Sequence, residues 1–173
     1  MNIEIVKVGF LNENCYILSI NNKSLVIDPG DEYLKIKRKL GNNELLGILI
    51  THRHFDHIGA LDEFINDYNV KVFEFNNLEE KLYEIGPFKF NVIFNPGHST
   101  DSVTYYFKNE GIMFVGDFIF KNGIGRCDLK GGNSKAMSES IDKIKKYNSC
   151  IIYPGHGDKT KLEDEKKNNP FFN

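Results

Sequence analysis

The chain of 173 residues has no tryptophan, few cysteines and prolines, and no long apolar run. Its three cysteines, Cys15, Cys127 and Cys150, are odd in number and widely spaced, which fits neither a disulfide framework nor a CxxC metal knuckle. No stretch approaches the roughly 18 apolar residues of a membrane span, and no charged leader precedes an apolar segment. We therefore expect reduced thiols, no membrane partner and a cytoplasmic location.

An excess of one charge is also missing. Lysine and arginine number 22 against 24 aspartates and glutamates, which gives a net charge of -2 and a pI near 6.2. Such a chain lacks the broad cationic field that a phosphate backbone attracts, so we expect no nucleic-acid partner. The length fits one domain with its own core, and we predict a single domain over residues 1–173, as a monomer or a homodimer.

Short β-branched and apolar runs alternate with helical spacings along the chain. The runs predict strands over 3–8, 15–18, 24–27, 45–50, 70–75, 88–94, 102–107, 112–115 and 150–153. Helical spacing predicts helices over 32–40, 59–68 and 133–147. This mixed order indicates an α/β protein, with two sheets and helices outside them.

All five histidines lie in short motifs that follow predicted strands. His52, His54 and His57 belong to an HxHxDH segment that also contains Asp56. Each of the other two follows Pro-Gly, and a further aspartate follows the 112–115 strand in a Gly-Asp pair; these are His98, His156 and Asp117. Their nitrogens and carboxylate oxygens match in kind and number the donors that two borderline-soft divalent ions require.

The spacing of the HxHxDH segment lets one loop serve two ions, because alternate side chains turn to one centre and the last two to its neighbour. Two ions roughly 3.5–4 Å apart can share a carboxylate and a water, lowering the pKa of that water from 15.7 toward about 7. Asp117 is the candidate bridge. Any one histidine of the set is equally well explained as a core or surface residue, but the whole set has the donor mix of a metal site. Zinc is the favoured metal, and iron or manganese would also accept these donors.

These motifs, in this order, resemble those of the metallo-β-lactamase-fold hydrolases, specifically the short glyoxalase II-like (hydroxyacylglutathione hydrolase-like) branch. The HxHxDH segment with its downstream partners is specific for the superfamily, and the GxGRxD segment at 123–128 and the Asn-Pro-Phe tail at 169–171 are typical of the branch. The likeness spans nearly the whole chain. It implies an αββα sandwich of two mixed β-sheets flanked by helices, with the metals at the sheet edge.

The resemblance also implies two ligand sets joined by one carboxylate. The first set is His52, His54 and His98, the second is Asp56, His57 and His156, and Asp117 joins them. Asp28, in the Asp-Pro-Gly turn, would support a ligand from behind, since a ligating imidazole usually donates its other N–H to a carboxylate or carbonyl. A turn-forming role before Pro29 explains Asp28 equally well.

The activity implied is hydrolysis of a small-molecule thioester, such as S-lactoylglutathione or a related acyl thioester, by a metal-bridging hydroxide, with Asp56 or Asp117 orienting the attack. Arg126 matches the cationic position of the branch and is expected to pair with a substrate carboxylate, although a salt bridge to Asp128 is the alternative. Asp128 replaces a tyrosine of the longer enzymes, which suggests a smaller or more open pocket. We expect Cys127 to be a small buried residue.

Other functions would place different demands on the same residues. A mononuclear iron persulfide dioxygenase would need two histidines and one carboxylate with open positions for oxygen. A phosphodiesterase or lactonase of the same superfamily would use both ions. A non-catalytic domain held together by its metals is the remaining alternative, although structural metal sites are usually closed by four protein ligands rather than left open in loops.

Overall fold

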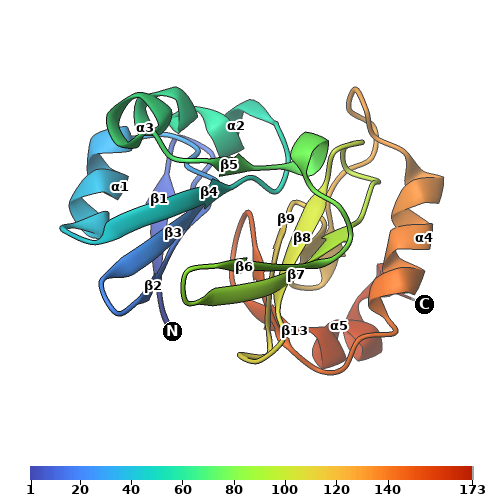
Figure 1. Ribbon diagram of the computed structural model, residues 1–173. Coiled ribbons are helices and arrows are strands. Elements are labelled where there is room, and N and C mark those ends of the chain that lie inside the picture. The colour runs from blue at the N-terminus through green and yellow to red at the C-terminus, as the bar shows by residue number, and fades with distance from the viewer. Residues whose placement is uncertain (173) are drawn as a thin grey trace.

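Two mixed β-sheets pack face to face in the computed structural model, which describes residues 1–172 (Figure 1). In the first sheet the strand order follows the chain, and β3 pairs antiparallel with β2 but parallel with β4. Its strands are β1 (Asn2–Val8), β2 (Glu13–Ile20), β3 (Lys23–Ile27), β4 (Glu44–Leu49) and β5 (Val72–Phe73).

The second sheet has the order β13-β12-β9-β8-β7-β6, and its one parallel pair is β9 with β12. Its strands are β6 (Leu82–Ile85), β7 (Phe88–Phe94), β8 (Val103–Phe107), β9 (Ile112–Gly116), β12 (Ile151–Pro154) and β13 (Thr160–Lys161). A small hairpin of β10 (Ile119–Phe120) and β11 (Gly123–Ile124) follows β9.

Apolar side chains from both sheets form the central core, in which Leu25, Phe90 and Phe114 are completely buried. The buried hydroxyl of Tyr105, on the second sheet, donates to the carbonyls of Ile50 (2.7 Å) and Phe73 (2.8 Å) at the first. These hydrogen bonds add directional contacts between the sheets. The rest of the core is stabilised by burial of apolar surface, which contributes roughly 25 cal/mol per Å².

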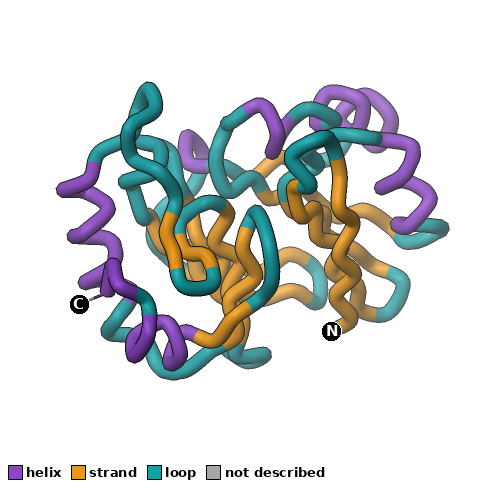
Figure 2. The backbone as a smooth tube through the Cα atoms, turned by 180° about the vertical axis from the view of Figure 1, so that it is seen from behind, coloured by secondary structure: helices purple, strands orange, loops and turns teal. Residues whose placement is uncertain are grey.

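Helices cover the outer face of each sheet, as the view from behind also shows (Figure 2). The first sheet is covered by α1 (Tyr33–Leu40) and α3 (Leu61–Tyr68), and the second by α4 (Ser134–Ile144) and α5 (Leu162–Asn168). Helices α1, α3 and α4 turn an apolar stripe inward, as amphipathic helices on a sheet do, whereas α5 buries Leu162. The αββα sandwich of two mixed sheets is therefore confirmed. No helix within residues 1–172 is long and apolar enough to cross a membrane.

Three local predictions were wrong or incomplete. The second half of the HxHxDH segment is not a turn but the short helix α2 (Phe55–Ile58). The strand predicted over 70–75 shrinks to the two residues of β5, and the 3-10 helix Phe75–Asn77 takes the place of its predicted end. Strand β6 and helix α5 were missed, since β6 is a partly exposed edge strand and α5 has only one buried apolar residue, Leu162.

Candidate metal centre

The loops that carry the predicted donors meet at one edge of the sandwich. β4 leads into the HxHxDH segment, β9 leads to Asp117, and β12 leads to His156. Since β9 and β12 are parallel neighbours, their carboxyl ends lie at the same edge. The loop between β7 and β8 brings His98 to that edge, so the structure gathers all seven predicted donors in one place.

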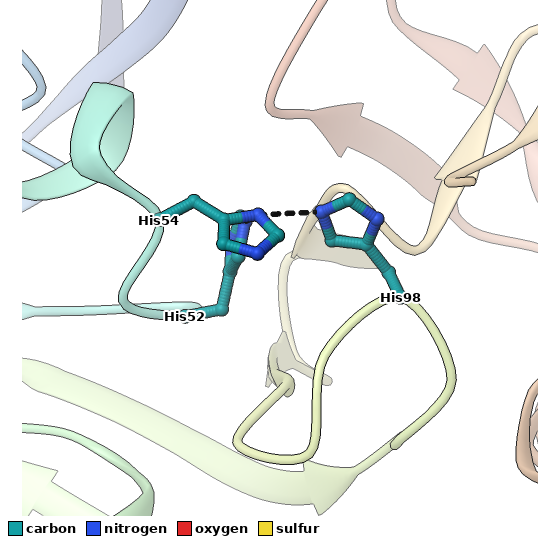
Figure 3. Close-up of side chains that lie close together, drawn as sticks. All are labelled: His52, His54 and His98. Carbon is teal, nitrogen blue, oxygen red and sulfur yellow. Dashed lines mark hydrogen bonds between the residues drawn. The ribbon is translucent and has the colours of Figure 1, made fainter. Parts of the chain in front are cut away.

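His52, His54 and His98 form the first donor set, and their rings converge on a common point (Figure 3). His54 Nδ1 lies 3.0 Å from His52 Nε2 and 2.8 Å from His98 Nε2. Burial, the largest effect, lowers the pKa of His52 well below its ordinary value. The neutral imidazole, which is the form that can bind a metal ion, is therefore favoured at His52.

Asp56, His57 and His156 form the second donor set. Asp56 Oδ2 lies 3.1 Å from His156 Nε2 and 3.9 Å from His57 Nε2. His57 is fully buried, whereas Asp56 and His156 are half-buried and open toward solvent. His57 thus fixes this set in the core, whereas Asp56 and His156 are accessible to solvent.

Asp117 lies between the two sets. Its Oδ2 is 3.6 Å from His98 Nε2, and its Oδ1 is 3.4 Å from His57 Nε2 and 3.7 Å from His156 Nε2. Burial raises the pKa of the Asp117 carboxyl, but the adjacent His57 imidazole and the charges of His156 and His98 outweigh that effect and lower the pKa overall. The carboxylate is therefore ionised and directs one oxygen to each set.

Two buried atoms at this centre test whether metal ions fit. Asp117 Oδ1 and His57 Nε2 have no hydrogen-bond partner among residues 1–172, although such groups are nearly always satisfied. The two atoms lie 3.4 Å apart, and the donor atoms of each set lie within 4.8 Å of one another. Imidazole and carboxylate clusters of this kind are typical of a two-metal site. The residues present therefore fit two divalent ions.

The histidines are supported from behind. His57 Nδ1 donates to Asp28 Oδ2 at 2.9 Å, and Thr51 donates its backbone N–H to Asp28 Oδ1 at 2.7 Å. His98 Nδ1 donates to the carbonyl of Arg126 at 2.8 Å, which leaves Nε2 free for a metal. Asp28 also has a left-handed φ of 47°, so it both shapes the turn and supports His57.

Two glycines leave room for the donors. A Cβ on Gly155 would lie 2.4 Å from Asp117 Oδ1 and 2.6 Å from His57 Cε1. A Cβ on Gly116, whose φ is 53°, would lie 2.2 Å from the hydroxyl oxygen of Thr51. The glycines before Asp117 and His156 are therefore required by close packing at the centre.

The β1–β2 hairpin contributes residues that the sequence interpretation missed. Asn14 donates its side-chain amide to the carbonyls of Pro154 (3.1 Å) and Gly157 (2.9 Å), which fixes the loop that carries His156. The Glu13 carboxylate is buried 3.8 Å from His57 Nδ1, and burial, as the largest effect, raises its pKa. The two Asn14 hydrogen bonds join residues 140 and 143 positions apart, and no local sequence pattern predicts them.

Arg126 and Asp128 form the salt bridge that was the alternative to substrate binding. Arg126 donates from Nε and Nη2 to the two carboxylate oxygens of Asp128, each at 2.7 Å, and both side chains are exposed at the rim of the centre. Cys127 is half-buried rather than fully buried, with its sulfur 3.6 Å from the carbonyl of Gly125.

A cavity of about 640 Å³ opens directly over the donors, within the usual size range of small-molecule sites. Asp117 and donors from both sets line its floor. Apolar side chains form most of the wall, and Arg126 is the one lysine or arginine in the lining; the apolar residues are Leu11, Phe55, Phe120, Ile124 and Leu129.

The fold and the donor clusters define a metal-dependent enzyme of a known class, and comparison with known proteins agrees. The model of the metallo-beta-lactamase superfamily matches residues 8–89 and 75–156. The chain belongs to this superfamily.

Individual relatives match over nearly their full lengths. A probable metallo-hydrolase, YqgX of Bacillus subtilis (strain 168), is 34% identical over 96% of this chain and 95% of its own. The hydroxyacylglutathione hydrolase GloC of Haemophilus influenzae is 28% identical over 100% and 99%. The crystal structure of TTHA1623 in a di-iron-bound form superposes with a TM-score of 0.90 at 30% identity, covering 97% of this chain and 99% of that one. The protein is thus a probable metal-dependent hydrolase with glyoxalase II-like relatives.

Proposed function

We propose that the protein hydrolyses a small-molecule thioester at a two-zinc centre formed by His52, His54, His98 and Asp117 with Asp56, His57 and His156. The observation that carries the proposal is the position of Asp117, which directs one carboxylate oxygen to each of two complete donor sets beneath an open cavity. The relative named as a hydroxyacylglutathione hydrolase supports the thioester. We place the reaction in the cytoplasm.

Bound at these residues, two divalent ions supply an activated water molecule and polarise a carbonyl oxygen. The half-buried donors His54, Asp56 and His156 face the cavity, so the acyl carbon approaches from that side. Asp56 and Asp117 accept hydrogen bonds and so orient the attacking oxygen. The carbon–sulfur bond then breaks, sulfur leaves as the thiolate, and the products are a carboxylate, a thiol and a proton.

Side chains of the cavity favour this direct route over covalent catalysis. No serine, threonine, cysteine or lysine lines the cavity in the part of the chain that the structure describes. Cys127 lies outside the lining, and burial raises the pKa of its thiol, which disfavours the thiolate. The completeness of the second donor set favours two ions over the single iron of a dioxygenase.

The test is steady-state hydrolysis with protein whose metal content has been measured. S-lactoylglutathione is compared with a simple acyl thioester that lacks glutathione. A β-lactam, a lactone and a phosphodiester are tested separately as alternative substrates. We expect thioester hydrolysis that requires about two metal ions per chain. Hydrolysis of one of these alternative substrates but of neither thioester would overturn the proposed substrate class. Oxygen uptake by protein with one iron per chain would overturn the two-metal mechanism.

A further inference from the structure

An exposed apolar surface adjoins the metal centre and has no role in holding it. This apolar rim consists of Phe10, Leu11, Phe55 and Leu129, of which Phe10 is 80% exposed and Phe55 64% exposed. The rings of Phe10 and Phe55 stack with centroids 6.2 Å apart. They come from the β1–β2 hairpin and from α2, so two separate elements place large apolar groups side by side in water, where they are normally avoided unless they bind something.

The apolar rim separates two cavities. A smaller cavity of about 190 Å³ lies beside the main one, with Val8, Phe10 and Gly59 in its lining. Leu11, Phe55 and Asp56 line both cavities. An extended group that starts at the metal donors can therefore pass along the rim without leaving apolar contact.

The charges at the cavity are the second argument. Glutathione carries two carboxylates, and Arg126 is the one arginine or lysine in the cavity lining. Its guanidinium is already paired with Asp128 through two bonds of 2.7 Å. A thiol component with two carboxylates thus meets no unpaired arginine or lysine in the lining formed by residues 1–172, whereas an apolar chain meets aromatic and aliphatic surface.

We infer that the substrate is the thioester of an unbranched apolar acyl chain, which lies along the apolar rim, and that Phe10 and Phe55 determine this specificity. The inference rests on the proposed function as far as the reaction is concerned. The apolar binding surface is argued independently of that function. Burial of each methylene against the rim is expected to favour binding about two- to fourfold.

Binding of product-like carboxylates tests the surface separately from turnover. Butanoate, hexanoate and octanoate are titrated into the zinc-loaded protein by calorimetry. We expect the dissociation constant to fall about two- to fourfold per methylene in the natural protein and to depend only weakly on length in Phe10→Ser. Leu34→Ser is the matched control, because Leu34 is 67% exposed on α1 and lines neither cavity. Metal content and circular dichroism confirm that each variant is folded and loaded.

Each outcome of these measurements either supports the inference or overturns it. Equal dissociation constants at all chain lengths would overturn the inference, as would an unchanged length dependence in both Phe10→Ser and Phe55→Ser. If Phe10→Ser converts a dimer to a monomer in sedimentation while the length dependence persists, the rim is an interface between copies and the inference fails. If length dependence is found but no thioester is hydrolysed, the apolar site stands and the proposed function fails.

Discussion

Replacement of Asp28 by asparagine should weaken the second metal set selectively. Asp28 accepts hydrogen bonds from the Thr51 backbone, the Thr51 hydroxyl and His57 Nδ1, at 2.7, 2.5 and 2.9 Å. Asparagine keeps the volume but offers one oxygen, so an NH2 group must oppose one of these donors. A buried hydrogen bond to a charged group contributes roughly 1.5–3 kcal/mol, and loss of such a partner behind a ligand costs about 10- to 100-fold in metal affinity.

The assay is competition against a chromophoric chelator, which resolves the two dissociation constants for zinc. In Asp28→Asn we expect one of the two dissociation constants to rise about 10- to 100-fold while the other changes much less, since His57 is absent from the set of His52, His54 and His98. Asp62→Asn is the matched control, because Asp62 is exposed on α3. Two dissociation constants within twofold of those of the natural protein would refute the role given to Asp28.

Further perturbations address other parts of the centre. Asp117→Asn should lower kcat at least 100-fold with an unchanged circular dichroism spectrum, and substantial residual activity would contradict the two-metal mechanism. Removing both ions with a chelator should lower Tm by about 10–20 °C relative to protein with free zinc at 100 times each dissociation constant, measured by calorimetry. Asn14→Ala should destabilise the fold by roughly 1–3 kcal/mol in urea titration, because two carbonyls near His156 lose their donor. A thiol reagent should modify Cys127 first and the other two cysteines only after unfolding, since Cys15 and Cys150 are buried and burial raises the pKa of Cys150 to about 11; rapid reaction of all three in the folded protein would contradict this.

The sequence could predict the donors because metal ligands have narrow chemistry. Histidines and aspartates at fixed spacing after predicted strands indicate loops that meet at one edge of the sheets. The resemblance of these motifs to a known family predicted the αββα sandwich that the structure has. Elements with strong periodicity, such as α4, were predicted within three residues of their ends. Weakly patterned elements were missed, because β6 and α5 depend on packing from neighbours rather than on their own apolar spacing.

Contacts between distant segments could not be predicted in the same way. Glu13 and Asn14 carry no local motif, and only the folded topology brings the β1–β2 hairpin against the loop of His156. Phe10 is a large apolar residue with no local motif, yet in the structure it is 80% exposed and stacks on Phe55. Such features arise from register and turn geometry, which a single sequence specifies only through the whole fold.

The two sheets are built from consecutive parts of the chain, β1 to β5 for the first and β6 to β9 with β12 and β13 for the second, but the metal donors come from both parts. His52, His54, Asp56 and His57 are made first during synthesis, and each set awaits a histidine from the later half, His98 or His156. A chain that ended before residue 156 would therefore lack one donor of the second set. An ion held by Asp56, His57 and His156 would link the two halves of the chain, so we expect its binding to require that the two sheets have packed together.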